Sequence, residues 1–298
     1  MLNGKIIKGI AGFYYVKSGD EVYRCKARGI FKERGIKPAV GDDVEFEIIE
    51  GNDDNLITEI LPRRNSFIRP FVANVDCFVI VTAAARPAPV LQTIDRFLVM
   101  AEKAETDIVV CINKCDLADE DGNRSRQKAA ETKKELLEIY EPIYPTVCLG
   151  KNVHDDMDKL MDLIKGKTTA LAGASGVGKS TILNRIVPHA LMETGNVSEK
   201  SQRGKHTTRH SELFTLGDGS DTMIFDTPGF TSFDILEAEE GELQFLYPEI
   251  AEYAGKCRYD NCRHIAEPEC AVKEALAKGL IHPKRYESYK LQMEEIRK

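Results

Sequence analysis

The feature that most constrains how this chain can fold is a glycine-rich run at residues 173–180, which reads G-A-S-G-V-G-K-S. It fits the phosphate-binding pattern G-x-x-x-x-G-K-[ST]. Residues 167–172 before it are β-branched and apolar and predict a strand, and residues 181–187 predict the first turns of a helix that ends before Pro188. The glycines let successive backbone N–H groups turn inward around a polyphosphate at the positive end of that helix.

Each residue of this run, together with the threonine that follows it, is a candidate nucleotide contact: Gly173, Ala174, Ser175, Gly176, Val177, Gly178, Lys179, Ser180 and Thr181. Lys179 would reach the β- and γ-phosphates and is also a candidate catalytic residue, because it would stabilise charge in the transition state. Ser180 would bind Mg²⁺. The alternative is a glycine-rich turn that binds nothing, which the flanking strand and helix disfavour.

The N-terminal part of the chain has the pattern of a small β-barrel. Short β-rich runs separated by turn residues lie at residues 5–10, 13–16, 21–27, 43–49 and 55–60. Such a series favours an oligonucleotide-binding (OB) fold. Between the third and fourth runs, Phe31 is surrounded by basic residues suited to RNA phosphates and an unstacked base, namely Lys26, Arg28, Lys32, Arg34 and Lys37. A solvated basic loop is the alternative.

The composition changes after residues 61–70, which contain two prolines and three arginines and which we interpret as a linker or hinge. Residues 74–82 and 107–112 are near-continuous apolar runs, as expected of parallel strands that are buried on both faces. Residues 92–104 between them have helical periodicity. These segments predict a βαβ unit.

The second apolar run ends in N-K-C-D, which makes Asn113, Lys114, Cys115 and Asp116 candidate base contacts. An aspartate can accept hydrogen bonds from both N1–H and N2–H of guanine, whereas adenine offers no such donor pair. Asn113 would tie the loop together, and the stem of Lys114 can lie against the base. Alone the pattern is weak, because a helix-capping aspartate explains many cases. Beside a phosphate loop it predicts a guanine nucleotide site.

Two segments after the phosphate loop predict the Mg²⁺ and γ-phosphate contacts. Residues 198–210 are polar and include Thr207 and Thr208, either of which could complete the Mg²⁺ shell in an order-to-disorder switch. An apolar run then leads into D-T-P-G, which has the form D-x-x-G. Asp226 would hold a Mg²⁺-bound water, and the Gly229 N–H would contact the γ-phosphate.

The water-orienting residue differs from the usual one. Ras-like GTPases carry a glutamine directly after D-x-x-G, but Phe230 stands here and cannot hydrogen-bond to water. We therefore expect slow intrinsic hydrolysis. His206 is the candidate catalytic group, since its imidazole can position or deprotonate water near neutral pH, and Thr207 and Thr208 beside it are candidates with it. The alternative is that His206 is simply a polar loop residue.

Three of the eight cysteines cluster with a histidine near the C-terminus in the order C-x4-C-x-H-x5-C. Cys257, Cys262, His264 and Cys270 supply three thiolates and one imidazole, a closed tetrahedral set for one structural Zn²⁺. Four protein ligands leave no open position, which disfavours a catalytic zinc. The alternative is a set of cysteines buried for packing alone.

Length and charge set the remaining bounds. A chain of 298 residues can bury a full α/β core and carry one or two smaller domains. Its sequence shows no secretory signal pattern and no apolar stretch long enough to span a bilayer, so we expect a soluble cytoplasmic protein without a membrane partner. We also expect a monomer. A net charge of -7 argues against indiscriminate coating of nucleic acid but permits local basic patches.

The order of the motifs is the most telling observation, because N-K-C-D precedes the phosphate loop, which precedes D-T-P-G. In Ras-like GTPases the guanine motif comes last, so this chain resembles a circular permutation of that fold. With the barrel before it and the Cys/His cluster after it, almost the whole chain resembles the RsgA (YjeQ/YloQ) family of ribosome small subunit biogenesis GTPases. The one departure is residues 148–151, which match the family's small base-contacting Ser-Ala-like motif poorly.

The resemblance implies an α/β fold with an OB-fold RNA-binding domain at residues 1–62, a circularly permuted P-loop GTPase domain at 63–232 and a mainly helical zinc-binding domain at 233–298. It also implies that GTP is hydrolysed to GDP, with Mg²⁺, during late maturation of the bacterial 30S subunit and its 16S rRNA. The alternative is a GTP-dependent RNA-binding assembly scaffold with negligible turnover of its own. A P-loop kinase or ATPase is disfavoured by Asp116.

Overall fold

The computed structural model describes residues 1–52, 54–117, 124–151, 155–187, 211–217, 220–226, 230 and 238–297. The chain divides into two compact units. Unit 1 comprises Met1–Cys77, Met161–Leu171 and Ser180–Phe230, and unit 2 comprises Phe78–Leu160, Ala172–Lys179 and Thr231–Lys298. Each unit is described in turn.

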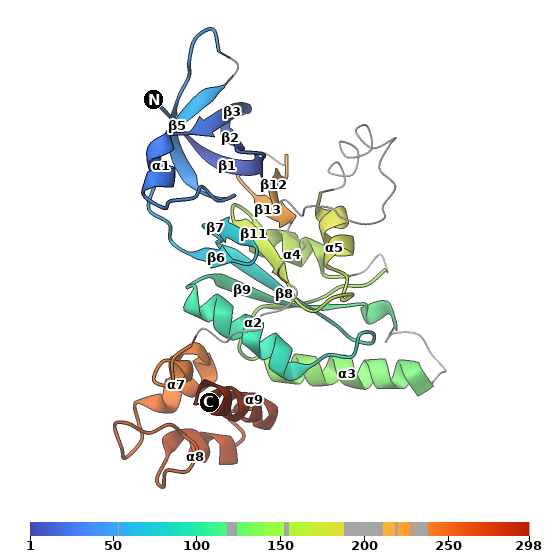
Figure 1. The fold of residues 1–298 in the computed structure, drawn as a ribbon. Helices are drawn as coiled ribbons and strands as arrows, with labels where there is room; N and C mark the ends of the chain where they lie inside the picture. Colours follow the sequence, from blue (N-terminus) through green and yellow to red (C-terminus); the bar gives the residue numbers. More distant parts are fainter. Residues whose placement is uncertain are drawn as a thin grey trace. The chain divides into compact units, whose positions relative to one another are not determined.

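A closed five-stranded barrel forms the N-terminal part of unit 1 (Figure 1). Its strands are β1 (Leu2–Ile10), β2 (Phe13–Ser18), β3 (Glu21–Ala27), β4 (Asp43–Glu47) and β5 (Asn55–Ile60). They pair in the order β1-β2-β3-β5-β4, and β1 also pairs with β4 to close the ring. The interior is filled by alternate, fully buried side chains, namely Ile6, Val16, Cys25, Val44, Phe46 and Ile57. The predicted OB-like barrel is therefore confirmed.

The helix α1 (Gly29–Glu33) between β3 and β4 changes the interpretation of Phe31. The sequence alone suggested a basic loop that presents this ring to an unstacked base. Phe31 is instead the buried residue of α1, with 7 % of its surface exposed. Its apolar ring gains more from burial in the domain than from solvent exposure, so it is not available to stack on a base.

The barrel is joined by hydrogen bonds to the strands of the α/β region. In unit 1, β11 (Thr168–Ala172) pairs in parallel with β13 (Met223–Asp226), and β13 pairs antiparallel with β12 (Glu212–Thr215). Strand β12 then pairs antiparallel with β1 of the barrel, with Lys8 opposite Glu212. One barrel strand is thus also a member of the larger sheet.

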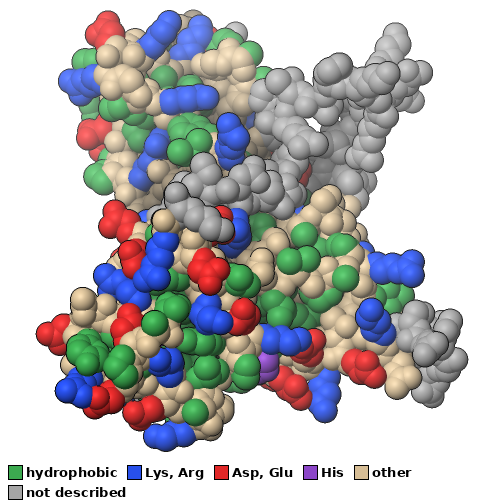
Figure 2. Space-filling view, turned by 60° about the horizontal axis from the view of Figure 1, so that its bottom comes forward, with side chains coloured by type: hydrophobic (Ala, Val, Ile, Leu, Met, Phe, Trp, Pro, Cys, Tyr) green, Lys and Arg blue, Asp and Glu red, His purple; other side chains and the backbone are tan. Residues whose placement is uncertain are grey.

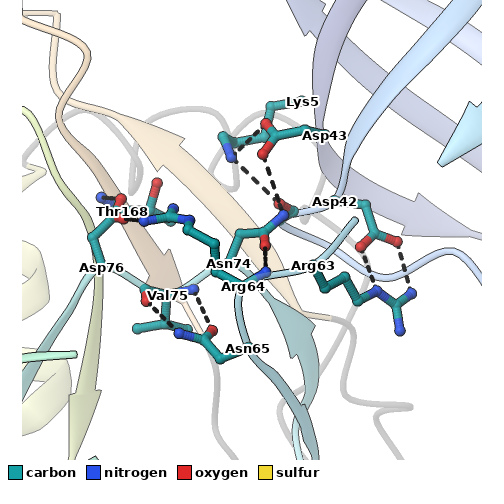
Figure 3. A network of polar contacts seen from close by, with 11 residues as sticks. Lys5, Asp42, Asp43, Arg63, Arg64, Asn65, Asn74, Val75, Asp76 and Thr168 are labelled. Carbon is teal, nitrogen blue, oxygen red and sulfur yellow. Dashed lines mark hydrogen bonds and ion pairs between the residues drawn. The ribbon is translucent and has the colours of Figure 1, made fainter. Parts of the chain in front are cut away.

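The predicted linker at residues 61–70 contains the first strand of a short β-hairpin. The hairpin consists of β6 (Ser66–Ile68) and β7 (Phe71–Ala73). Figure 3 shows the polar network that fixes its two ends. Arg63 donates to the fully buried Asp42 through Nε (2.6 Å) and Nη2 (2.9 Å). Asn74 donates to the Gly41 carbonyl at 3.1 Å. These bonds hold the connection against the barrel rather than leaving it a hinge.

The same network reaches the start of β11, the strand that leads into the glycine-rich run. Asp76 accepts a hydrogen bond from the Thr168 N–H at 2.8 Å and forms an ion pair with Arg64. Although burial opposes ionisation, the Arg64 guanidinium and the Thr168 N–H hold the pKa of the Asp76 carboxyl below its usual value. Arg63 and Arg64 before the hairpin and Asp76 after it therefore connect the hairpin to the barrel and to β11.

In unit 2, β8 (Cys77–Ala83), β9 (Asp107–Asn113) and β10 (Thr146–Cys148) lie in the order β10-β9-β8. Every residue of β8 is buried, as the continuous apolar run predicted. Helix α2 (Leu91–Lys103) connects β8 to β9, so the predicted βαβ unit is confirmed. Helix α3 (Arg124–Tyr140) also belongs to unit 2, while α4 (Met157–Ile164) is divided between the two units and α5 (Lys179–Ile186), apart from its first residue, belongs to unit 1.

The C-terminal part of unit 2 is helical, with η2 (Leu243–Leu246), α7 (Pro248–Ala254), α8 (Ala271–Ala277) and α9 (Pro283–Ile296). Its core also includes Val99 of α2, so these helices pack on the βαβ unit. Tyr289 and Met293 of α9 are fully buried, which makes α9 a cover for this region. None of the helices among the described residues combines the length and apolar character needed to cross a membrane.

A buried arginine joins α9 to α2. Arg285 is fully buried and donates to Asp95 of α2 at 2.5 Å and to Glu249 of α7 at 2.7 Å, with its guanidinium 4.4 Å from the ring centre of Tyr247. A guanidinium removed from water is tolerated because both carboxylates compensate its charge. The pairing specifies how the C-terminal helices dock on α2.

Replacing this arginine should be costly. We expect Arg285→Ala to lower the free energy of unfolding by about 3–5 kcal/mol, because two carboxylates would remain buried without a counter-charge. The matched control is Arg297→Ala, since Arg297 pairs with Glu240 in an ion pair whose side chains are 43 % and 42 % exposed. Its loss should be below about 1 kcal/mol in the same urea denaturation followed by circular dichroism. Equal losses for the two variants would contradict this account of Arg285.

Candidate nucleotide and metal sites

The glycine-rich run forms a tightly wrapped loop between β11 and α5. Gly173, Gly176 and Gly178 have φ values of +141°, +78° and +108°, a region that other residues rarely adopt. A Cβ atom at Gly173 would lie 2.1 Å from the Val81 carbonyl oxygen, and one at Gly178 would lie 2.2 Å from Asn113 Nδ2. Both the conformation and the close approach of neighbouring groups therefore require glycine at these two positions.

Side chains of the N-K-C-D segment hold this loop directly. Asn113 Nδ2 donates to the Val177 carbonyl at 2.9 Å, and Lys114 Nζ donates to the Gly176 carbonyl at 2.7 Å. Lys114 Nζ also donates to the carbonyl of Arg86. These hydrogen bonds join two motifs that lie far apart in the sequence. Asn113 and Val177 are separated by 64 residues.

Asp116 lies in the short helix η1 (Cys115–Leu117) beside the segment that matched its family pattern poorly. A Cβ atom at Gly150 would lie 2.9 Å from the Asp116 backbone nitrogen and 3.0 Å from its Oδ1. The backbones are also bonded, since the Cys115 N–H donates to the Leu149 carbonyl at 2.9 Å. Sequence reasoning assigned no role to Gly150. Its position two residues after the end of β10 and its lack of a side chain were the available signal.

Cys115 faces inward. Its thiol is buried, with 4 % of the residue exposed, and donates to the Ile112 carbonyl at 3.1 Å. The hydrogen bond with Cys148, and then burial, raise the pKa of the Cys115 thiol far above its usual value. Any contact to a base from this position is therefore made by the backbone.

Lys179 folds back over its own loop. Its Nζ donates to the Gly173 carbonyl at 2.6 Å and to the Ala174 carbonyl at 2.9 Å. Burial lowers the pKa of Lys179 to about 8, because removal from water disfavours the charged ammonium group. Ser180 and Thr181 follow in the first turn of α5 and are exposed. The ammonium is thus positioned to exchange carbonyl partners for a stronger anionic one.

Asp226 is the last residue of β13 in unit 1 and lies directly opposite Glu212 of β12. Burial, and then the neighbouring Glu212 charge, raise the pKa of the Asp226 carboxyl above its usual value. The other predicted residues of this group, His206, Thr207, Thr208 and Gly229, lie outside the described residues.

The predicted cysteine and histidine ligands converge in unit 2. The donor atoms of Cys257, Cys262, His264 and Cys270 all lie within 4.8 Å of one another. Cys257 Sγ is 3.8 Å from Cys270 Sγ, and His264 Nδ1 is 3.3 Å from Cys270 Sγ. A tetrahedron with metal–sulfur bonds of about 2.3 Å has edges of about 3.8 Å. The geometry is therefore compatible with a zinc site.

A residue that sequence reasoning missed orients the histidine. His264 Nε2 lies 2.8 Å from Gln244 Oε1, an acceptor, so Nε2 carries the proton and Nδ1 faces the thiols with its lone pair. Cys262 and Cys270 are each 2 % exposed, and His264 is fully buried. Three of the four residues are buried and Cys257 is half-buried, and a set whose four positions are all filled by protein suits a structural metal rather than a catalytic one. Gln244 stands 20 residues from His264 in the chain, beyond the reach of a spacing argument.

Comparison with known proteins agrees with this architecture. The RsgA GTPase family matches residues 60–236, and the RsgA N-terminal domain matches residues 3–56. Two relatives, from Agathobacter rectalis and Alkaliphilus metalliredigens, are named small ribosomal subunit biogenesis GTPase RsgA. They are 43 % and 44 % identical, over 99 % and 100 % of this chain and 98 % and 99 % of their own lengths.

Solved structures show the same arrangement. YjeQ from Thermotoga maritima superposes with a TM-score of 0.82 at 33 % identity, covering 99 % of this chain and 98 % of that one. YloQ, described as a circularly permuted GTPase, superposes with a TM-score of 0.80 at 35 % identity, covering 100 % and 95 %. The motif order, the barrel, the Cys/His cluster and these matches show that the chain belongs to the RsgA GTPase family of circularly permuted GTP hydrolases.

Proposed function

We propose that this protein binds the 30S ribosomal subunit and hydrolyses GTP during late maturation of the small subunit and its 16S rRNA, in the cytoplasm and as a monomer. The observation that carries the nucleotide part is the direct hydrogen bond from Asn113 to the Val177 carbonyl, which joins a guanine-type loop to a phosphate loop. The names of the relatives, small ribosomal subunit biogenesis GTPases, support the biological process.

Within this proposal, Asp116 accepts the two guanine N–H groups and the Lys114 stem covers the base, with Asn113 and the Cys115 backbone fixing the loop. Lys179 leaves its two carbonyl partners for the β- and γ-phosphates, whose charge favours the ammonium form. Ser180 would hold Mg²⁺, with Asp226 acting through a water and Thr207 or Thr208 as a further ligand, and the Gly229 N–H would contact the γ-phosphate. The ion would supply positive charge to stabilise the phosphates.

The four cysteine and histidine ligands would hold one structural Zn²⁺, which ties the segment after α7 to the start of α8. We assign residues 1–62, 63–232 and 233–298 to the RNA-binding barrel, the GTPase domain and the zinc-binding domain. The barrel surface supports RNA binding, since the ring of Phe13 has Arg24 at 5.2 Å and Lys26 at 5.0 Å from its centre. An aromatic ring flanked by cations suits a base and its phosphates.

The charge distribution fits a selective rather than a general nucleic-acid binder. On the face drawn in Figure 2, Lys and Arg side chains lie among Asp and Glu side chains instead of forming one block. Asp54 also forms ion pairs with both Arg24 and Lys26. RNA would have to replace this carboxylate, so binding depends on a complementary site and not on net attraction.

A scaffold with negligible turnover is the second candidate, and Phe230 favours it. This residue occupies the position of the usual water-orienting glutamine, is fully buried, and packs edge-on against Phe67 at 5.6 Å between ring centres. Such a ring cannot turn toward water without leaving the core. The rate of GTP hydrolysis, measured with and without 30S subunits, separates a GTPase from this scaffold.

Base selection tests the guanine assignment. Asp116→Asn should lower the preference for GTP over xanthosine triphosphate by about 10- to 100-fold, since the two hydrogen bonds to the base edge are worth about 1–3 kcal/mol together. The competition of the two nucleotides for binding measures this. Asp158→Asn, on the exposed face of α4, is the matched control and should change nothing. An Asp116→Asn protein with the parent's preference would overturn the assignment.

Metal removal tests the zinc proposal. Freshly purified, reduced protein should contain one zinc per chain, and chelation should unfold the region from about Tyr247 onward while sparing GTP binding, because structural zinc contributes about 10 kcal/mol or more of folding free energy. Cys262→Ser should lose the metal. Cys25→Ser, which alters a buried barrel cysteine, should keep it. Metal analysis that finds no zinc in the parent would refute the site.

The role of His206 is tested by stimulation. We expect 30S subunits to accelerate GTP hydrolysis strongly in the parent and hardly at all in His206→Ala, with GTP affinity unchanged, since general-base groups contribute about 10²- to 10⁴-fold. His210→Ala, in the same segment, is the matched control and should be stimulated like the parent. Equal stimulation of all three proteins would move the catalytic group to the ribosome or to another residue.

A further inference from the structure

Three charged residues form one row across the strands that connect the barrel to the GTPase region. Lys8 of β1 lies opposite Glu212 of β12, and Glu212 lies opposite Asp226 of β13. Both pairings are antiparallel, so residues that oppose each other project from the same face of the sheet. The three side chains therefore stand side by side, with the glutamate in the middle.

The row contains two like charges and one opposite charge. Lys8 Nζ is 2.8 Å from Glu212 Oε1, and the two side chains are 33 % and 32 % exposed. Like charges directly opposite each other on neighbouring strands are destabilising. Glu212 and Asp226 stand directly opposite each other on neighbouring antiparallel strands, so the two carboxylates repel each other when both are charged. Lys8 thus neutralises the neighbour of Asp226 from the barrel side.

The row of Lys8, Glu212 and Asp226 lies next to two segments that we assign to nucleotide binding. Glu212 opens the strand that follows the predicted switch segment at 198–210, and Asp226 closes the strand that leads into D-x-x-G. Lys8 comes from the other end of the sequence, 204 residues away from its partner. Only Glu212 therefore stands between Lys8 of the barrel and Asp226, the carboxylate that we assign to the Mg²⁺ and γ-phosphate site.

We propose that Lys8 is a positioning residue for GTP binding. It holds the Glu212 carboxylate toward β1 and neutralises it, which leaves Asp226 as the member of the acidic pair that serves the nucleotide. Without Lys8, Glu212 adds an unbalanced negative charge beside Asp226 and disfavours the γ-phosphate. The inference rests on the proposed function, because it uses the role assigned to Asp226.

A second ion pair on β1 provides a control that distinguishes the proposed role of Lys8 from general stabilisation by a surface ion pair. Lys5 Nζ is 2.7 Å from Asp43 Oδ1, an equally close contact, but Asp43 belongs to β4 of the barrel. Lys5→Gln therefore removes a comparable ion pair that lies outside the charged row. It should leave nucleotide affinity unchanged.

The experiment is a double-mutant cycle read out as the ratio of GTP to GDP affinity, measured with fluorescent nucleotides at saturating Mg²⁺. Lys8→Gln should lower the ratio about three- to fivefold, the size expected for a partly exposed ion pair. Lys8→Arg should restore it, since the charge returns. In a Glu212→Gln background, Lys8→Gln should have no further effect, because no glutamate charge remains to be neutralised.

The opposite results are equally clear. An unchanged ratio in Lys8→Gln, or the same loss with and without Glu212, would overturn the inference, as would a matching loss in Lys5→Gln. Two further measurements distinguish failure of this inference from failure of the proposed function. A parent that does not bind GTP, or an Asp226→Asn protein with the parent's ratio, refutes the nucleotide assignment itself and the inference with it.

Discussion

The proposed nucleotide site depends on the hydrogen bond from the Asn113 amide to the Val177 carbonyl. In a permuted chain, the base-recognition loop and the phosphate loop are brought together by folding rather than by sequence proximity. The asparagine amide and the Lys114 ammonium supply the connection, and Gly178 lets the amide approach at a distance that any side chain would block. The motif that we propose to recognise the base therefore also shapes the loop that we propose to hold the phosphates.

Local patterns predicted the parts of the molecule whose structure is set locally. The glycines at 173 and 178, the wholly buried β8 and the clustered Cys/His ligands all followed from residue type and spacing. What failed or was missed depended on tertiary context. Phe31 is buried by a short helix inside an otherwise polar stretch, and Gln244 reaches His264 only once the C-terminal helices have packed. The switch residues lie outside the described part of the chain, so their roles stay predictions.

Polar groups fix the barrel to the hairpin that follows it, beside buried apolar residues such as Val40 and Val72. Asp42 is fully buried, and Arg63 and the Ala39 N–H satisfy its carboxylate. Gly41 permits this arrangement, because a Cβ there would lie 2.0 Å from the Ala73 carbonyl oxygen. Directional bonds of this kind specify one arrangement of the hairpin and the barrel, since a shifted one would leave a charge buried without a partner.

Strand β1 has two hydrogen-bonding edges, and two different strands pair with successive parts of one of them. Its first residues, Leu2 to Lys5, pair with β4 to close the barrel, while Lys8 further along pairs with β12. Strand β2 takes the opposite edge. The barrel thereby covers β12, which would otherwise be the outermost strand of its sheet with free N–H and C=O groups. A chain without the barrel would expose this edge of β12, and unpaired edge strands are templates for pairing with another chain, so the barrel also covers a potential site of aggregation.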